Sequence, residues 1–358
     1  MFKKLFGKGG KKKAPKGFYE LTIASINKLT DNTVEVAFDI AADTKSFFKF
    51  TPGQYLNFAI EIDGEEIRRS YSICSGPEEQ LAVAVKLVEN GKMSTWFNQT
   101  AEVGENIFVS PPEGNFVRPK EAKNIVAIAA GSGITPIMSM AKAAEASEVQ
   151  IQLFYGSRSF DQIIFRDTIS QLKNTKATHF LSGEVSEGTV NSRINKEIFT
   201  DIIKNDLSIL KSDAFFLCGP EQMIMDIEEV LKLFGVNESK IFFELFTTPT
   251  LMKSNNTGEA TGSFSGTSKV TVLLDDDEMT FDLDADGPAI LDKVNQEGFD
   301  APYSCKGGVC CTCKAKILEG NAHMTVNYSL TDQEVEEGYI LTCQAHPASE
   351  SLKISYDD

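Results

Sequence analysis

The sequence predicts a multidomain protein made of an antiparallel β-barrel, an α/β domain with a parallel sheet, and a small α+β domain. At 358 residues the chain is longer than one typical domain. The hydrophobic pattern changes near residue 120, and five of the seven cysteines follow a Ser/Thr/Gly/Asn-rich stretch. The expected divisions are a basic tail at 1–16, the barrel at 17–119, the α/β domain at 120–253, a linker at 254–268 and the last domain at 269–358.

The barrel is predicted from short segments rich in β-branched and aromatic residues. Residues 33–40 read TVEVAFDI and residues 54–60 read QYLNFAI. Turn signals such as Thr51-Pro52-Gly53 separate these segments. Several short strands at this spacing indicate a small antiparallel barrel.

The α/β domain is predicted from alternation of buried strands with helical segments. Residues 124–130, NIVAIAA, form a continuous apolar run that is typical of a strand buried on both faces. A glycine-rich turn and a helical segment at 137–146 follow, and residues 149–157 and 214–219 repeat the strand pattern. This order favours a parallel sheet covered by helices.

Charge and composition limit the classes of partner. The net charge of −16 argues against nucleic acid, because phosphates attract basic surfaces. Residues 268–358 carry 18 acidic and 6 basic residues, a net charge of −12. No apolar run is long enough to span a bilayer, and the lysine-rich N-terminus lacks the apolar segment of a secretory signal. We therefore expect a cytoplasmic protein with no membrane span.

Four cysteines carry the most specific signal. Cys305, Cys310 and Cys313 lie in one short loop, and 29 residues separate Cys313 from Cys343. This is the plant-type spacing of ligands to a 2Fe–2S cluster, in which four thiolates hold two irons. Zinc is the alternative, but its sites usually use paired Cys-x2–4-Cys motifs.

Two features of the cysteine loop complete this prediction. Gly307 and Gly308 allow the loop to fold closely, so that backbone N–H groups point at sulfur. Cys311 lies between the ligands and is not needed by the motif, which favours a small packed side chain. The 254–268 stretch has the composition of a flexible linker, so this domain should be a tethered module.

An Arg-x-Tyr-Ser motif lies inside the predicted barrel, at Arg69-Ser70-Tyr71-Ser72. Alone it could be an ordinary strand. Its sequel contains Lys86 and then the segment Gly91-Lys92-Met93-Ser94-Thr95. A glycine turn that leads into a helix start can hold a phosphate on its free N–H groups.

A second phosphate-binding signal follows the apolar run at 124–130. The loop Gly131-Ser132-Gly133-Ile134-Thr135-Pro136 differs from GxGxxG, but it links a buried strand to a helix as a dinucleotide-binding loop does. Cys218-Gly219-Pro220 stands at the carboxyl end of a later strand, where such sheets bind ligands. Both motifs predict a nicotinamide nucleotide.

The choice between NADPH and NADH depends on residues 155–159, Tyr-Gly-Ser-Arg-Ser. NADH sites commonly place an acid at this strand end for the ribose hydroxyls. Ser157 and Arg158 instead suit a 2′-phosphate, and Arg166 adds charge. The sequence therefore favours NADPH over NADH.

With these motifs in order, residues 17–250 resemble the ferredoxin–NADP reductase superfamily, and the last domain resembles the β-grasp ferredoxins. The resemblance implies that Arg69 neutralises the FAD pyrophosphate, Tyr71 lies against the isoalloxazine ring, and Ser72 approaches flavin N5. It also implies that Ser94 and Thr95 meet the phosphates and that Thr135 and Cys218 lie near the nicotinamide. Phe246 is expected beside the flavin, with a core aromatic as the alternative.

Two sets of candidate site residues follow from these motifs and the resemblance. Those expected to act in catalysis are Ser72, Cys218 and Glu244. Those expected to bind FAD or the nucleotide are Arg69, Tyr71, Ser72, Lys86, Met93, Ser94, Thr95, Gly131, Gly133, Thr135, Pro136, Ser157, Arg158, Arg166, Cys218, Gly219, Pro220 and Phe246.

The domain order resembles that of the reductase components of bacterial oxygenases, and residues 303–313 and 338–344 are most similar to those of phenylacetyl-CoA epoxygenase reductases. The resemblance implies electron transfer from NADPH through FAD and the 2Fe–2S cluster to a di-iron oxygenase or similar acceptor. Another ring hydroxylase, a desaturase or a separate acceptor protein remains an alternative. A ferredoxin-like binding or assembly protein is the alternative outside enzymes, but the intact flavin and nucleotide motifs argue against it.

Overall fold

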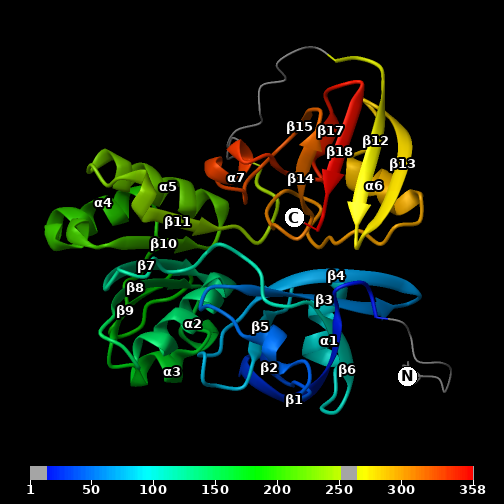
Figure 1. Cartoon of the computed structure of the whole chain (residues 1–358). Helices are drawn as coiled ribbons and strands as arrows, with labels where there is room; N and C mark the ends of the chain where they lie inside the picture. Colours follow the sequence, from blue (N-terminus) through cyan, green and yellow to red (C-terminus); the bar gives the residue numbers. More distant parts are fainter. Residues whose placement is uncertain (1–13, 251–263, 358) are drawn as a thin grey trace.

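The structure is a computed structural model that describes residues 14–250 and 264–357. The chain forms three domains, with a barrel and a parallel-sheet domain side by side and the C-terminal domain packed over the barrel (Figure 1). Most of the predicted N-terminal tail and of the predicted linker lies outside the described residues.

The first domain is an antiparallel barrel, as predicted. Its strand order is β4-β3-β6-β1-β2-β5, and a bridge between Ile73 and Val83 joins the two ends of this sheet. Phe38, Phe58 and Leu56 lie in its interior with under 2% of their surface exposed. The elements are β1 (Tyr19–Thr30), β2 (Thr33–Asp39), β3 (Tyr55–Ile62), β4 (Glu65–Ser72), β5 (Ala82–Lys86), α1 (Lys92–Gln99) and β6 (Asn106–Val109).

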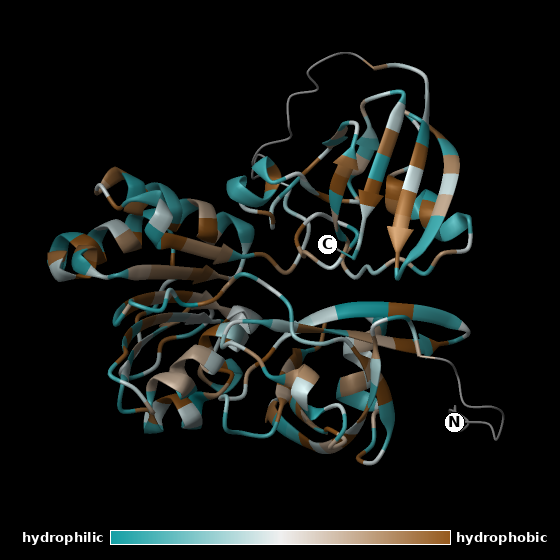
Figure 2. Ribbon diagram, in the orientation of Figure 1, coloured by the Kyte–Doolittle hydropathy of each residue, from teal (hydrophilic) through white to brown (hydrophobic). Residues whose placement is uncertain are grey.

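The second domain is a five-stranded parallel sheet in the order β11-β10-β7-β8-β9. Its central strands β7 and β10 are almost continuously hydrophobic (Figure 2) because helices cover both faces, whereas the edge strand β9 carries several polar residues. Helices α2 and α3 pack on one face, and α4 and α5 pack on the other. The elements are β7 (Asn124–Ala130), α2 (Ile134–Ala144), β8 (Gln150–Ser157), α3 (Arg166–Gln171), β9 (Thr175–Leu181), α4 (Lys196–Asn205), β10 (Ala214–Cys218), α5 (Glu221–Leu233) and β11 (Ile241–Glu244).

The third domain is a mixed five-stranded sheet, β13-β12-β18-β14-β16, packed on helix α6, with a small β15–β17 pair beside it. Strand β12 begins at Thr267, inside the predicted linker, and pairs with β13 as the expected hairpin. The elements are β12 (Thr267–Leu274), β13 (Asp277–Asp284), α6 (Ile290–Gln296), β14 (Lys314–Glu319), β15 (Ala322–Met324), α7 (Asp332–Glu336), β16 (Tyr339–Leu341), β17 (Ala345–Pro347) and β18 (Ser351–Ser355).

Among the helices of residues 14–250 and 264–357, none has the length and apolar character needed to cross a membrane. The strand order places the end of β7 beside the end of β10, where the order in which strands are added to the sheet reverses. Open parallel sheets bind ligands at such a switch point. The two predicted nucleotide motifs, at 131–136 and 218–220, therefore lie side by side at this switch point.

Candidate functional site

The predicted flavin motif lies on β4, and strand alternation divides it between two faces. In the β3–β4 ladder, Leu56 pairs with Tyr71 and Phe58 pairs with Arg69. Directly opposed residues share a face of the sheet, so Arg69 and Tyr71 lie on the side of Leu56 and Phe58. We call this side the inner face of β4.

The inner face adjoins helix α1. The Tyr71 ring meets Phe97 of α1 edge-on, with 5.8 Å between centroids. The first turn of α1 contains Met93, which is buried in the barrel core, and the partly exposed Thr95. The structure thus brings the two segments of the predicted flavin site together.

Arg69 and Ser94, both predicted to bind phosphate, differ in how far their polar groups are already hydrogen-bonded within the protein. Arg69 is exposed and donates one hydrogen bond, to the carbonyl of Arg68 at 2.6 Å, so most of its guanidinium is open to an anion. The hydroxyl of Ser94 is buried, donates to the Gly91 carbonyl at 3.1 Å and accepts from the Val88 N–H at 3.2 Å. Ser94 shapes the turn before α1, which leaves backbone N–H groups as the phosphate donors to be expected there.

The nucleotide loop touches the end of β10. A Cβ added to Gly133 would lie 2.1 Å from the Cys218 carbonyl oxygen, so only glycine permits this approach. Gly131 begins the turn into α2, and Lys86 Nζ lies 3.8 Å from the position of a Cβ on Gly131. Pro136 and the buried Thr135, whose hydroxyl donates to the Ser132 carbonyl, stand in the first turn of α2.

The three predicted catalytic residues converge from three strands. The Ser72 hydroxyl, at the end of β4, donates to Glu244 Oε2 at 3.2 Å. Glu244 is the parallel-sheet partner of Cys218, and Gly219-Pro220 follows Cys218 to begin α5. Desolvation raises the pKa of Glu244 to about 8, because protein atoms surround its carboxyl group although the residue keeps some surface. Glu244 is therefore mostly protonated at neutral pH.

The residues predicted to select the nucleotide lie near the end of β8. The Ser157 hydroxyl is buried close to the Tyr155 hydroxyl and, within the described residues, has no hydrogen-bond partner in normal geometry, which fits a polar group supplied by a ligand. Arg158 is exposed. Arg166 instead pairs with Asp161 and Asp167 and lies 4.7 Å from the Phe160 ring centroid. Phe246 is 44% exposed rather than part of the core.

The four predicted cluster ligands form two pairs of sulfurs. The Cys310 thiol donates to the Cys305 sulfur at 3.0 Å, and the Cys313 thiol donates to the sulfur of Cys343. No three His, Cys, Asp or Glu side chains within the described residues surround a single-metal position. Two thiolates per iron is the arrangement that a 2Fe–2S cluster requires.

The loop also supplies donors to sulfur. The hydrogen bond from Cys310 and backbone N–H groups, including that of Gly307 at 3.3 Å, lower the pKa of Cys305. Cys311 is different, because its thiol donates to the Ser329 carbonyl at 3.4 Å and burial raises its pKa to about 11. The ligand set therefore fits the cluster without Cys311.

The outer face of β3 and β4 contacts the cysteine loop, and no motif in the sequence indicates these contacts. Asn57 is fully buried and its amide donates to Thr312 Oγ1 at 3.1 Å. The Thr312 hydroxyl in turn donates to Glu113 Oε2 at 3.0 Å. The Cys311 N–H donates to the Tyr55 hydroxyl at 3.2 Å. We call the four side chains Tyr55, Asn57, Glu113 and Thr312 the polar cluster.

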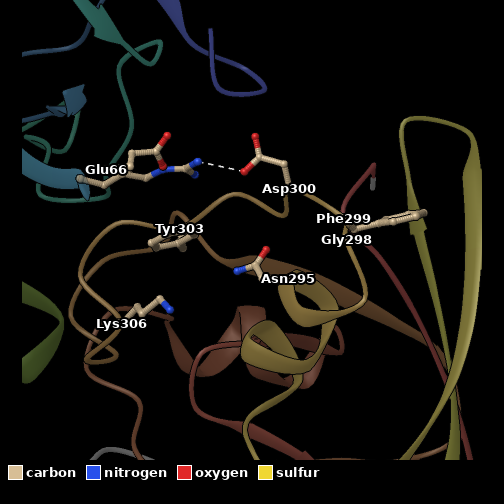
Figure 3. A pocket seen from close by; sticks show the side chains of 8 residues that line it. Glu66, Asn295, Gly298, Phe299, Asp300, Tyr303 and Lys306 are labelled. Carbon is tan, nitrogen blue, oxygen red and sulfur yellow. Dashed lines mark hydrogen bonds and ion pairs between the residues drawn. The ribbon is translucent and has the colours of Figure 1, made fainter. Parts of the chain in front are cut away.

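A second group of contacts surrounds Arg68, which is 5% exposed. Its guanidinium pairs with Glu66 at 2.7 Å within β4 and with Asp300 of the third domain at 2.9 Å, the contact dashed in Figure 3. It also stacks on Tyr303, 4.3 Å from the ring centroid. These side chains line a pocket of about 390 Å³ between the first and third domains.

The cysteine loop touches the second domain as well. A Cβ on Gly307 would lie 2.0 Å from Thr248 Oγ1, in the segment after β11. Val309 and Tyr328 pack against the hydrophobic core on the α4–α5 side of the parallel sheet. The predicted cluster site is therefore held between both other domains.

Family profiles match in the same order along the chain. An oxidoreductase FAD-binding domain matches residues 20–117, an oxidoreductase NAD-binding domain matches residues 127–229, and a 2Fe-2S iron-sulfur cluster binding domain matches residues 272–348. The chain is 34% identical over 353 residues to a subunit of the 1,2-phenylacetyl-CoA epoxidase of Escherichia coli K12, covering 95% of this chain and 98% of that protein.

The chain belongs to the family of oxygenase reductase components. A further relative, the ferredoxin reductase component of 3-ketosteroid-9-alpha-monooxygenase from Mycobacterium tuberculosis, is 30% identical over 95% of this chain and 96% of its own. The structure of phthalate dioxygenase reductase shares the fold, with a TM-score of 0.59 at 24% identity over 95% of this chain and 98% of that one. This reductase thus carries FAD, a nicotinamide nucleotide and a 2Fe–2S cluster and transfers electrons.

Proposed function

We propose that this reductase takes electrons from NADPH and delivers them to a di-iron oxygenase that acts on phenylacetyl-CoA or a related thioester. The proposed electron path is supported by the position of β4, which lies between the nucleotide motifs and the cysteine loop. Its Ser72 end meets Cys218 and Glu244 of the nucleotide domain, while its outer face meets the cysteine loop. The acceptor is inferred from the 34% identity to the epoxidase protein over nearly the whole of both chains.

The chain's residues have distinct tasks in this proposal. Arg69 and the α1 turn hold the FAD pyrophosphate, and Tyr71 supports the isoalloxazine ring. Gly133 and Thr135 place the nucleotide beside Cys218. Protonated Glu244 supplies a proton through Ser72 when the Ser72 hydroxyl turns from donating to Glu244 to accepting from it. Bound FAD supplies the conversion of a two-electron hydride donor into single-electron transfers.

NADPH preference is supported by the exposed Arg158 beside the unpartnered Ser157 hydroxyl. Arg158→Ala should lower kcat/KM for NADPH by roughly 10- to 100-fold and change that for NADH much less, because a charge-assisted hydrogen bond contributes ~1.5–3 kcal/mol. Arg166→Ala is the matched control, since Asp161 and Asp167 already neutralise Arg166. An equal loss with both nucleotides in Arg158→Ala would remove this assignment.

The acceptor is tested by reconstitution. The purified reductase, NADPH and the remaining epoxidase components should convert phenylacetyl-CoA, whereas a 3-ketosteroid oxygenase should receive electrons poorly. Turnover of the ketosteroid enzyme at the higher rate would contradict the proposed acceptor while leaving the reductase activity intact.

The domain divisions at 119 and 253, a third domain that begins with β12 at Thr267 rather than at residue 269, and a cytoplasmic location belong to the same proposal. The family profiles end at 117 and 229 and begin again at 272, which supports three units. None of the seven cysteines, all of which lie within the described residues, is paired in a disulfide, which suits a reducing compartment.

A further inference from the structure

The cysteine loop packs on the barrel through polar groups of both domains. These groups would be exposed to solvent if the two domains were separated. Asn57, Thr312 and Ser304 have 0%, 8% and 6% of their surface exposed, and all three take part in contacts between the first and third domains. Buried polar groups cost free energy unless they are paired, so the polar surface of β3 and β4 is complementary to the cysteine loop of the third domain.

The contacts fall directly on the loop that carries the cluster ligands. Thr312 lies between Cys311 and the ligand Cys313, and Ser304 precedes the ligand Cys305. The Ser304 hydroxyl is 2.7 Å from the hydroxyl of Ser70 on β4. Each contact therefore holds a ligand-bearing segment rather than a remote part of the third domain.

Two residues anchor this docking surface. Glu113 is fixed to Tyr55 of β3 by two backbone hydrogen bonds of 2.9 Å, and its carboxylate accepts from both Asn57 and Thr312. Arg68 crosses to Asp300, whose second oxygen accepts from the Lys16 N–H at 3.0 Å. Tyr303 and Phe18 lie over the Arg68 guanidinium and help to bury it, while the Asp300 side chain stays 47% exposed.

Strand alternation connects these anchors to the flavin motif. Arg68 and Ser70 are on the outer face of β4, and Arg69 and Tyr71 are on the inner face. One strand thus carries the predicted flavin contacts Arg69 and Tyr71 on its inner face, while its outer face carries the loop contacts and, at the end of the strand, Ser72.

We propose that Arg68 and Glu113 are positioning residues that dock the cysteine loop on β3 and β4, and that this docking sets how fast an electron passes from the flavin to the cluster. The inference rests on the proposed electron path. In each such transfer one electron leaves reduced flavin and one ferric iron becomes ferrous, with no covalent bond made or broken. The residues act on distance and orientation through their contacts with the third domain.

The test compares full-length holoprotein variants. Arg68→Ala and Glu113→Gln should speed hydrogen exchange at the amides of residues 304–313 by about tenfold, because the contacts that protect the loop are weakened. The Cys311 amide, which donates to Tyr55, is the most informative position. In rapid mixing with NADPH, flavin bleaching should stay near its normal rate while cluster reduction slows by about tenfold.

Three controls separate docking from general damage. Asp300→Asn should reproduce the effect of Arg68→Ala from the other side of the interface. Arg68→Asp combined with Asp300→Arg should recover part of the protection and of the cluster-reduction rate. Lys353→Ala removes an ion pair with Glu278 inside the third domain and should change neither measurement.

The outcomes distinguish this inference from the proposed function. Normal amide protection and normal cluster reduction in Arg68→Ala and Glu113→Gln would overturn the positioning role, with the electron path itself unaffected. A wild-type protein whose flavin is reduced without reduction of the cluster would instead overturn the proposed path.

Discussion

Arg68 and Arg69 are neighbours in sequence, but strand alternation gives them opposite environments. Arg68 is almost fully buried and already paired with Glu66 and Asp300, whereas Arg69 is exposed and bonded only to a carbonyl. A buried arginine with its acids in place has a structural task, and an exposed arginine beside a helix start is suited to an anionic ligand. Two identical side chains can thus serve different domains because a strand presents two faces.

The largest effect is expected when the 2Fe–2S cluster, whose loop packs on the outer face of β4, is removed. Cys343→Ser should abolish the cluster and nearly all electron delivery to a protein acceptor, because one iron loses a ligand. FAD content and NADPH oxidation with ferricyanide should persist. Iron and acid-labile sulfide assays with both acceptors measure this.

Cys311→Ser is the matched control for that variant. Its thiol faces the Ser329 carbonyl and not the ligand pairs, so iron and sulfide content should remain complete. Loss of the cluster from Cys311→Ser would show that the ligand assignment is wrong.

The inner face is tested by Arg69→Ala. Loss of a charge-assisted contact of ~1.5–3 kcal/mol should weaken FAD binding by roughly 10- to 100-fold. Cluster content and exchange at the cysteine loop should not change, since Arg69 does not reach the third domain. Fluorescence titration of the apoprotein with FAD gives the affinity, and normal FAD affinity in this variant would end the distinction between the two arginines.

The pKa of Glu244 allows a test of the contact between the Ser72 end of β4 and the nucleotide domain. Its folded pKa of about 8 lies above the unfolded value, so the native state binds the extra proton between about pH 4.5 and pH 8. Stability from this group is complete below the unfolded pKa and is lost as the pH rises through 8.

Glu244→Gln should therefore flatten the decline of Tm between about pH 5 and pH 8. The same variant should slow flavin reduction several-fold at pH 7 and remove its dependence on a group with a pKa near 8. An unchanged pH profile of flavin reduction would exclude Glu244 as the titrating group.

Ionic strength should have the smallest effect of these tests. It should change the encounter of the acidic third domain with its partner rather than the contacts of β4. The net charge of −12 over residues 268–358 should attract a basic partner, and salt screens such attraction. Between about 50 and 300 mM salt, electron delivery to the oxygenase should slow a few-fold while flavin reduction by NADPH stays constant. Delivery that is indifferent to salt would contradict charge steering.

Residues in local motifs could be predicted from the sequence, and residues in the docking surface could not. Cys305, Cys310 and Cys313 are recognised by their spacing, and Gly133 is recognised because it follows an apolar strand. Glu113 and Thr312 are 199 residues apart and become partners only when two domains meet. The doubled arginine at 68–69 is a signal in the sequence, but the face of each side chain depends on the register of β4 with β3.

Placement in the fold also changes the interpretation of individual predicted residues. The sequence predicts that Arg166 adds charge at the nucleotide, but its acidic neighbours in the α3 region already pair with it. The resemblance implies that Ser94 meets phosphate, but its hydroxyl closes the turn before α1. In both cases the residue type suits the ligand, while the nearest partner is set by folding of the loop.

Because the cysteine loop contacts two domains of its own chain, an acceptor that needs the same loop would have to compete with those domains. Thr248 approaches Gly307 on one side, and Tyr55 and Asn57 hold the loop on the other. A domain on the same chain meets its docking surface at an effective concentration that reaches the millimolar range for short connections. An acceptor at micromolar concentration that needs the same loop must bind it more tightly or wait for its release, so stronger internal docking would load the cluster faster and unload it more slowly.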